Sequence, residues 1–255
     1  MRVLIGTPIY DDQLLVPYHV SVMGLVAHFR RTRPEVSFDS SLIAATLVSK
    51  ARNAMATLVL NDPSITHLLF IDADMGFSPT LIEKMIDFDQ PVTGAVYPAR
   101  LNAYARIGEI ARAVEGPQFR DVAQNYIGGS DVFQRDDGRA VIRGDFVRVQ
   151  HAGAGILLIK REALEQMQAA MPQLWSKRPG DGYPSWGVTG PVFQPFEALQ
   201  KPDGFFMGED VSFCRRWTHG CKGEIWSCFT ETIRHVGRER YTGAYVHRMR
   251  HEGEI

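Results

Sequence analysis

The stretch His67-Leu68-Leu69-Phe70-Ile71-Asp72-Ala73-Asp74-Met75 joins a short, continuously apolar run to a pair of carboxylates. A run of this length without alternation is typical of a strand that is buried on both faces of a parallel sheet. The carboxyl end of this strand carries Asp72 and Asp74. In open α/β sheets, ligands bind outside the carboxyl ends of the strands. The stretch therefore predicts a fold class and also the edge of the sheet at which a site lies.

Strand and helix patterns alternate around this stretch. Further buried strands are expected over residues 2–9, 36–42, 91–97 and 146–160, the last interrupted by Gly153-Ala154-Gly155. Helices are expected over residues 17–31, 48–60, 161–170 and 208–217. Ser78-Pro79 begins one more helix, with serine as the cap and proline at the first helical position. The alternation predicts an α/β fold with a mostly parallel central sheet flanked by helices.

Two segments break the alternation. Residues 101–145 contain Gly128-Gly129 and Asp136-Asp137-Gly138, which predict a hairpin or a flexible insertion. Residues 172–204 are rich in proline, glycine, tryptophan and tyrosine, and we expect a long surface loop there. The 255 residues suffice for one large α/β domain with its own core.

Composition and charge exclude several classes of protein. The formal net charge of -1 provides no basic field for nucleic acid, so no nucleic-acid partner is expected. No run of 18 or more apolar residues predicts a transmembrane helix, although peripheral membrane contact stays open. The first residues resemble a strand and not a signal peptide. Cys214, Cys221 and Cys228 are an odd number without a zinc spacing, which favours free thiols and a cytoplasmic location.

Asp72 and Asp74 are the first candidate site. Carboxylates at positions i and i+2 can share one Mg²⁺ or Mn²⁺ ion, and such an ion commonly bridges to a diphosphate. An Asp-x-Asp pair in a turn is more often a cap or is simply solvated. Its position directly after a strongly apolar strand favours a functional role here.

Two further candidates lie near predicted helix starts. Arg52, in Ser49-Lys50-Ala51-Arg52-Asn53, could pair with phosphate or with the carboxylates, or lie on a solvated helix face. Glu209-Asp210 follows Gly208, and a carboxylate there can take a proton from an attacking hydroxyl. The alternative is that the acids only complement the helix dipole, which would also lower their basicity unless burial offsets it.

The last two candidates lie near the chain ends. His235, in Ile233-Arg234-His235-Val236-Gly237, could ligate Mn²⁺ while its arginine neighbours meet diphosphate charge, or it could be structural. Tyr10 ends Gly6-Thr7-Pro8-Ile9-Tyr10, where its ring could stack on a base or belong to an ordinary turn.

Taken in order, these motifs resemble the nucleotide-sugar glycosyltransferases of the GT-A fold. The resemblance rests on the segments Thr7-Pro8-Ile9-Tyr10, Ala51-Arg52-Asn53, His67 to Met75, Val92 to Pro98 with Arg100, Gly153-Ala154-Gly155-Ile156, Gly208-Glu209-Asp210 and His235. The resemblance covers most of residues 1–100 and 146–243. Within the family, the sequence is distantly similar to fungal mannan-polymerase transferases and to bacterial and viral relatives. Residues 101–145 and 172–204 have no counterpart in it.

The resemblance implies a single domain over residues 1–255. Residues 1–100 would form the nucleotide-sugar-binding half and residues 101–145 an insertion. Residues 146–255 would form the acceptor half and a C-terminal tail that binds metal and diphosphate.

The resemblance also implies roles for individual residues. Mn²⁺ or Mg²⁺ would be held by Asp72, Asp74 and His235. The donor, a UDP- or GDP-sugar, would contact Thr7, Pro8, Tyr10, Arg52, Asp72, Ala73 and Arg100. Asp210 would be the base of an inverting transfer to a glycan or other hydroxyl acceptor, and Glu209 would orient that acceptor. Trp175, Tyr183 and Trp186 would stack on the acceptor or simply pack.

Three other functions stay open. A phosphatase of the haloacid-dehalogenase type places its aspartate pair after the first strand and follows it with Thr or Val, whereas Met75-Gly76 follows here. A sugar nucleotidyltransferase would need a glycine-rich, basic loop after the first strand, whereas Asp11-Asp12 makes this loop acidic. A non-catalytic sugar- or nucleotide-binding module is also compatible with the sequence, although Asp210 argues mildly against it.

Overall fold

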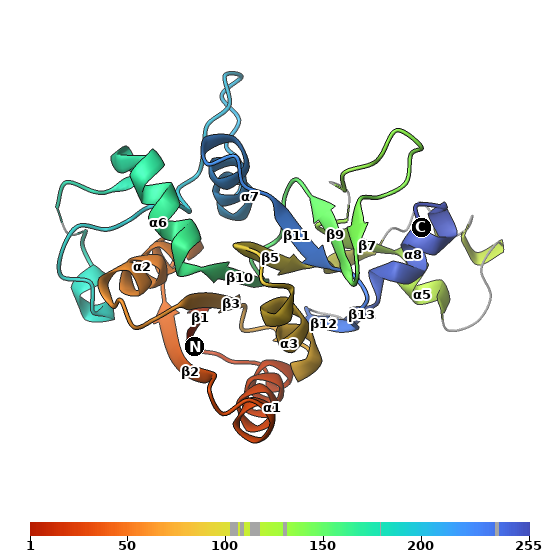
Figure 1. Ribbon diagram of the computed structural model, residues 1–255, viewed down its shortest axis with the longest axis horizontal. Helices are drawn as coiled ribbons and strands as arrows, with labels where there is room; N and C mark the ends of the chain where they lie inside the picture. Colours follow the sequence, from red (N-terminus) through yellow and green to blue (C-terminus); the bar gives the residue numbers. More distant parts are fainter. Residues whose placement is uncertain (103–106, 108–109, 113–117, 130–131, 179, 238–239) are drawn as a thin grey trace.

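The computed structural model describes residues 1–102, 107, 110–112, 118–129, 132–178, 180–237 and 240–255. The strands of its central sheet are β1 (Arg2–Ile9), β2 (Ser37–Ala44), β3 (His67–Ile71), β5 (Val92–Ala95), β8 (Ile142–Arg143), β9 (Phe146–Val149), β10 (Ile156–Lys160) and β11 (Ile225–Cys228). In the described part of the chain, these eight strands lie in the order β2-β1-β3-β10-β5-β11-β9-β8 (Figure 1).

Most strands of this sheet run in one direction. β1 is parallel to β2 and to β3, and β5 is parallel to β11. β10 lies antiparallel between β3 and β5, and β9 is antiparallel to β11 and β8. The predicted α/β class with a mostly parallel sheet is confirmed. The strand character expected over residues 146–160, interrupted by Gly153-Ala154-Gly155, is divided between β9 and β10, which occupy separate places in the sheet.

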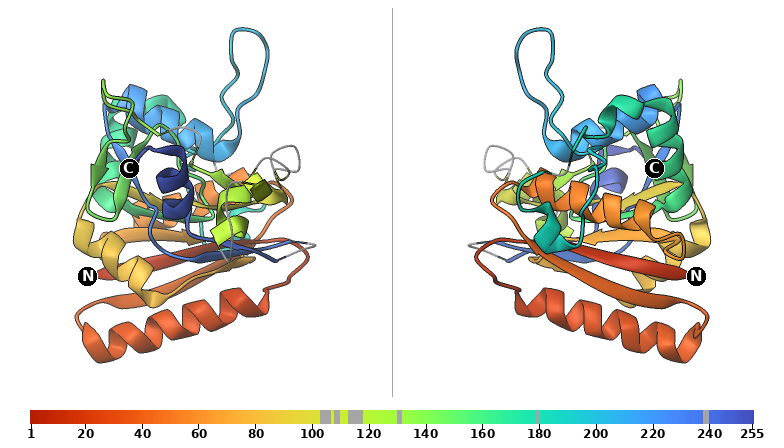
Figure 2. Two further views of the ribbon diagram at one scale, coloured as in Figure 1. Left: turned by 90° about the vertical axis from the view of Figure 1, so that its right-hand side faces the viewer. Right: turned by 90° about the vertical axis from the view of Figure 1, so that its left-hand side faces the viewer.

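Helices cover both faces of the sheet. They are α1 (Val16–Thr32), α2 (Val48–Asn61), α3 (Pro79–Phe88), α5 (Gln118–Ala123), α6 (Arg161–Ala170), α7 (Glu209–Arg215) and α8 (Tyr245–Glu252), and a π-helical turn, η3 (Arg216–Gly220), continues α7. Figure 2 shows α1 on the side of the sheet opposite to α2 and α6. The predicted cap of α3 is present, with the Ser78 side chain accepting from the Thr80 N–H and Pro79 in the first turn.

The continuous apolar run of β3 follows from this double cover. Leu68 and Phe70 pack into the core on the α2 side, while Leu69 and Ile71 pack into the core on the α1 and α3 side. Every residue of β3 is buried. A strand buried on both faces needs apolar side chains at every position, which is why no polar alternation is present.

Two small sheets lie beside the main one. β4 (Met75–Gly76), β12 (Ile233–Val236) and β13 (Arg240–Gly243) form an antiparallel set with β12 in the middle. β6 (Tyr97–Asn102) pairs with β7 (Gln124–Ile127). The pairing of β6 with β7 gives part of the predicted 101–145 insertion a hairpin-like arrangement. Other parts of that insertion lie outside the described residues.

Contrary to the prediction of a surface loop, the segment 172–204 does not lie on the surface throughout, although residues 200–204 at its end are exposed. It forms two short 3-10 turns, η1 (Pro172–Leu174) and η2 (Tyr183–Trp186), and buries Phe193 and Phe196 completely. Asn53 of α2 holds it, donating to Glu197 at 2.8 Å and accepting from the Phe196 N–H at 2.9 Å. The prediction was wrong because an irregular segment hides its buried positions: without a helical or strand period, sequence does not reveal which side chains face the core.

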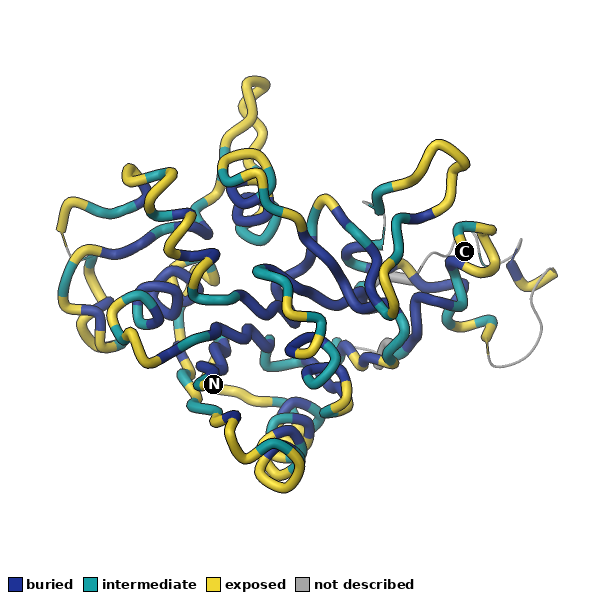
Figure 3. The backbone as a smooth tube through the Cα atoms, in the orientation of Figure 1, coloured by how far each residue is buried: buried dark blue, intermediate teal, exposed yellow. Residues whose placement is uncertain are grey.

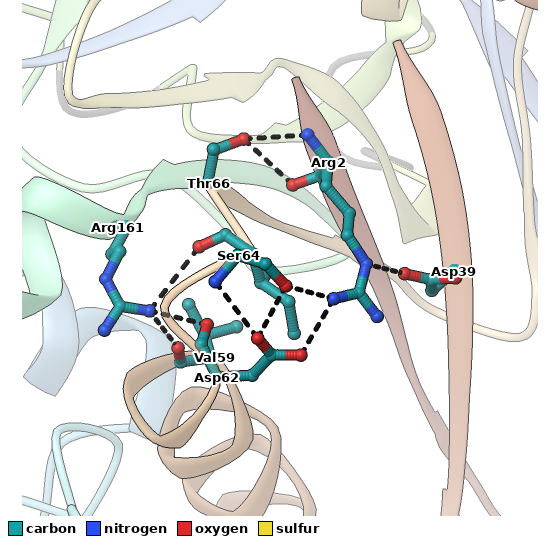
Figure 4. A network of polar contacts seen from close by, with 8 residues as sticks. Arg2, Asp39, Val59, Asp62, Ser64, Thr66 and Arg161 are labelled. Carbon is teal, nitrogen blue, oxygen red and sulfur yellow. Dashed lines mark hydrogen bonds and ion pairs between the residues drawn. The ribbon is translucent and has the colours of Figure 1, made fainter.

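A polar network closes the edge of the sheet at which β1 and β3 begin. Figure 4 shows Arg2 of β1 bound to Asp39 of β2 and to Asp62 after α2, with Nη1–Oδ2 at 2.8 Å for the second pair. Arg161 donates to the Leu60 and Asp62 carbonyls, each at 2.9 Å, and so caps the carboxyl end of α2. Because β1 and β3 are parallel, Asp72 and Asp74 lie at the opposite edge, which stays free for a site.

Among the residues that the structure describes, no helix combines the length and the apolar character needed to cross a bilayer.

Candidate functional site

The turn Asp72-Ala73-Asp74 is held by backbone hydrogen bonds on two sides. The Asp72 N–H donates to the Gly155 carbonyl at 2.9 Å, and the Val236 N–H donates to the Asp74 carbonyl at 2.9 Å. The Met75 N–H closes the turn onto the Asp72 carbonyl at 3.0 Å. The two carboxylates are therefore fixed between the start of β10 and the end of β12.

A cavity of about 510 Å³ opens at this turn, at the carboxyl ends of β1, β2 and β3. Six residues predicted from the sequence line it: Pro8, Tyr10, Asp72, Ala73, Asp74 and Arg100. Lining residues that the sequence did not single out are Ile9, Gln13, Leu15, Ala45, Thr46, Val48, Val236 and Gly237. The volume is in the range of sites for small molecules and cofactors.

Asp74 lines the cavity and contacts His235, which is buried and is not one of the lining residues. His235 Nε2 lies 3.4 Å from Asp74 Oδ2, because β12 pairs with β4 in a register that sets His235 opposite Met75. His235 Nδ1 lies 2.8 Å from the Pro98 carbonyl, which can only accept, so Nδ1 donates to it. The expected juxtaposition of these two residues is present.

Arg100 supplies positive charge at the same carboxylate. Its Nη1 lies 3.0 Å from Asp74 Oδ2, and more than half of the Arg100 side chain is exposed. The guanidinium thus occupies the position next to Asp74 where another cation could bind. An arginine in this position can also bind phosphate in a bidentate manner.

Arg52 connects the cavity wall to the second acidic motif. Its side chain is only 3% exposed; Nη2 donates to Asp72 Oδ1 at 2.8 Å and Nε donates to Glu209 Oε1 at 3.3 Å. Nη1 donates to the Ala154 carbonyl at 3.1 Å, and the guanidinium lies 5.0 Å from the centre of the Phe70 ring. All three guanidinium nitrogens thus donate hydrogen bonds inside the protein. This supports the predicted pairing with carboxylates and not the solvated helix face.

The acidic pair Glu209-Asp210, at the start of α7, lies in a partly buried environment. Burial raises the pKa of the Asp210 carboxyl, and the charge of Glu209 raises it further, while the Val211 N–H and Arg52 act in the other direction. Burial also raises the pKa of Asp72, against the effect of Arg52. The start of a helix lowers the pKa of a carboxylate, so a carboxylate that acts as a base there needs an opposing effect. Burial supplies this effect at Asp210.

Tyr97 is a buried neighbour of this group that the sequence did not single out as a site residue. Its hydroxyl oxygen accepts the Gly155 N–H at 3.1 Å, and its ring lies edge-on to His235 with the centroids 5.5 Å apart. Burial raises the pKa of Tyr97, so the phenol is neutral. A side-chain carbon at Gly155 would lie 2.7 Å from this hydroxyl, and one at Gly153 would clash with it even more closely. The Gly153-Ala154-Gly155 pattern is therefore explained by the space that Tyr97 occupies.

Several predicted residues lie outside the cavity wall. Thr7 is fully buried, and its hydroxyl lies 2.7 Å from the Tyr18 hydroxyl, so its side chain faces α1 and not the cavity. Tyr183 is 4% exposed, and the Trp175 ring packs 5.4 Å from Phe193. Trp186 packs at the edge of the same core. The packing alternative for these three aromatic residues therefore holds.

The residues near Asp74 suit a hard divalent cation. The described part of the chain contains no preformed group of three or more His, Cys, Asp or Glu residues in ligand geometry. Asp74 nevertheless lines the cavity, and the buried His235 contacts its carboxylate. Mg²⁺ and Mn²⁺ are often bound through one or two protein ligands together with substrate phosphates and water. The donor set therefore fits a cation that binds together with a diphosphate.

Comparisons with known proteins do not indicate a function for this chain. No protein-family model matches the chain, and no curated protein matches it. The solved structure of A197 from STIV is similar to it with a TM-score of 0.48 and 14% sequence identity, over 95% of this chain and 94% of A197. A likeness this distant does not bear on family or activity.

Proposed function

We propose that this protein is a metal-dependent glycosyltransferase of the GT-A fold that moves a sugar from a nucleoside diphosphate donor to a hydroxyl acceptor. The observation that carries the proposal is the contact between Asp74, on the wall of a cavity of about 510 Å³, and the buried His235, 3.4 Å away. The two residues come from distant parts of the chain. Their contact beside a ligand-sized cavity favours a binding role over a simple surface ion pair.

The donor occupies the cavity at the ends of β1, β2 and β3. The Tyr10 ring is 72% exposed there and offers a face for the nucleobase, with Pro8 and Ala73 beside it. Arg100 neutralises diphosphate charge. Asp74 and His235 would hold Mn²⁺ or Mg²⁺, and the ion would supply Lewis-acid stabilisation of the diphosphate charge.

The acceptor lies on the side of Glu209 and Asp210. Asp210 takes the proton of the acceptor hydroxyl while the acceptor oxygen bonds to the anomeric carbon and the bond to the diphosphate breaks. The raised pKa of Asp210 makes it a stronger base than an exposed aspartate. Arg52 holds Glu209 and Asp72 in fixed positions, which sets the acceptor side relative to the donor side.

The proposal is tested by binding of UDP and GDP, measured by calorimetry with and without Mn²⁺. One of the two nucleotides should bind in the presence of Mn²⁺, and Asp74→Asn should weaken that binding by about ten- to a hundredfold. Asp136→Asn, at an exposed position, is the matched control and should bind like the wild type. Binding of equal strength without metal in Asp74→Asn would overturn the proposal.

Turnover separates a transferase from a binding module. Asp210→Asn should keep nucleotide binding and lose hydrolysis and transfer of the sugar by about a hundredfold or more. If the wild type binds a nucleotide with Mn²⁺ but neither hydrolyses nor transfers any UDP- or GDP-sugar, the chain is a binding module and the catalytic part of the proposal is wrong.

A further inference from the structure

Residues 199–207 form an arm that projects from the body of the molecule directly before α7. Figures 1 and 2 show this hairpin standing out beyond the helices, and Figure 3 shows it exposed except at its base. It closes at its base where the Met207 N–H donates to the Leu199 carbonyl at 2.9 Å, and the Leu199 N–H donates to Ser212 of α7 at 2.9 Å. The arm is thus attached to the helix that carries Asp210.

The arm exposes two adjacent aromatic rings. Phe205 is 64% exposed and Phe206 is 61% exposed. The chain has 14 phenylalanines, all within the described residues, and these two are the ones that are exposed. Exposed, adjacent and projecting phenylalanines are costly in water and are typical of a surface that contacts something apolar.

The polar groups of the arm are mostly satisfied within it. The Lys201 N–H donates to the Phe205 carbonyl at 2.8 Å, and the Gly204 N–H donates to the Lys201 carbonyl at 2.9 Å. The only acid of the arm, Asp203, accepts the Phe205 N–H at 3.0 Å, and the Gln200 amide donates to the Gly204 carbonyl at 3.2 Å. A sugar-binding platform would need free polar groups beside the rings, whereas entry into a lipid interface needs these groups to be paired already.

A single cation completes the arm. The ammonium of Lys201 lies 5.3 Å from the centre of the Phe205 ring. Two apolar rings with a lysine beside them match the lipid interface, where rings enter the acyl boundary and the ammonium meets lipid phosphate.

We propose that the arm formed by residues 199–207 docks shallowly on a lipid bilayer through Phe205 and Phe206, with Lys201 at the level of the lipid phosphates. The docking does not depend on the proposed transfer reaction. Where both hold, the bilayer lies on the acceptor side of Asp210, and the acceptor hydroxyl is carried by a membrane-anchored molecule.

Helix α1 presents a second exposed apolar surface and serves as the internal control. Val20 is 63% exposed and Met23 is 57% exposed. In Figures 1 and 2, α1 lies at the end of the molecule opposite to the arm, so one flat bilayer cannot contact both surfaces.

The experiment is flotation of the full chain with vesicles of phosphatidylcholine and phosphatidylglycerol. The wild type should float with the vesicles, and the double variant Phe205→Ser/Phe206→Ser should partition at least about tenfold less. Val20→Ser/Met23→Ser, which removes a similar exposed apolar surface from α1, should float within about twofold of the wild type. Binding of Mn²⁺ and nucleotide should be unchanged in both double variants, which separates this test from that of the proposed function.

Three results would overturn the inference. The wild type would stay with the unbound fraction if the arm instead contacts a soluble glycan or a protein. The arm variant would float as well as the wild type if the rings do not enter the bilayer. An equal loss in both double variants would show that any exposed apolar surface suffices.

Discussion

At the scale of single residues, Arg52 is the link between the two acidic motifs of the site. It is 3% exposed and contacts Asp72 and Glu209 at 2.8 and 3.3 Å. A buried guanidinium with two carboxylate partners and a carbonyl partner has little freedom to move, and it fixes the partners in turn. The pKa of Asp210 therefore depends on the charge of Glu209, which raises it, and on the charge of Arg52, which lowers it.

Glu209→Gln should move the acid limb of the kcat/KM profile to lower pH. A base must be deprotonated, so activity falls as pH falls through the raised pKa of Asp210. Removing the Glu209 charge removes one cause of that raised pKa and leaves Arg52 less neutralised, and both effects lower the pKa. The plateau should fall about ten- to a hundredfold, because the proposed role of Glu209 is to orient the acceptor.

The profile is measured as donor turnover against pH for the wild type and for Glu209→Gln, with the exposed Glu35→Gln as the control. The control should superimpose on the wild type. An acid limb that stays in place or moves to higher pH in Glu209→Gln would separate Asp210 from the role of base.

At the scale of elements, the segment 172–204 contributes a second layer to the core. The Phe196 ring stacks on Phe213 of α7 with the centroids 4.5 Å apart and meets Phe70 of β3 edge-on at 5.2 Å. A segment without regular structure therefore joins the strand before Asp72 to the helix that carries Asp210. Its packing sets the distance between the two halves of the site.

Phe196→Ala should lower the free energy of unfolding by about 3–5 kcal/mol, since it opens a cavity in a fully packed region. Phe206→Ala, at an exposed position of the projecting arm, should change it by less than about 0.5 kcal/mol. Urea unfolding of both variants measures the difference. Similar losses in the two variants would mean that the 172–204 segment is not part of the core.

At the scale of the whole molecule, the edge of the sheet away from the site contains a histidine that links folding to pH. His67, at the start of β3, is buried, and burial together with Lys160 lowers its pKa from 6.5 to about 4. Its Nδ1 lies 2.9 Å from the Thr66 hydroxyl. The folded state thus favours the neutral imidazole, whereas the unfolded chain becomes protonated near the ordinary pKa of histidine.

His67 should make the protein less stable in mild acid. Its contribution is fully present above about pH 6.5 and is lost as pH falls toward about 4, by up to about 3 kcal/mol. His67→Gln should therefore lose less unfolding free energy than the wild type between about pH 7 and about pH 4.5. Urea unfolding at both pH values measures this, with the exposed His251→Gln as the control. Equal losses in wild type and His67→Gln would exclude the coupling.

The sequence by itself determined the elements and the edge of the sheet at which the site lies. The run from His67 to Ile71, the strand over residues 2–9 and the cap at Ser78 follow from local patterns, because burial on both faces and helix starts each leave a short-range signature. Asp72 and Asp74 could be placed at a strand end for the same reason. Activity, metal and donor stay predictions that rest on the resemblance and on the site.

Only the tertiary structure decided which of these residues meet. β4 has two residues, too few for any pattern, yet its pairing with β12 brings His235 to Asp74. The sequence left open whether Arg52 is solvated, and the packing of α2 places its side chain inside the protein. The burial of Phe193 and Phe196 and the projection of residues 199–207 left no periodic signal either. Local periodicity encodes elements, whereas contacts between distant segments depend on how all of them pack at once, and that packing fixed the site.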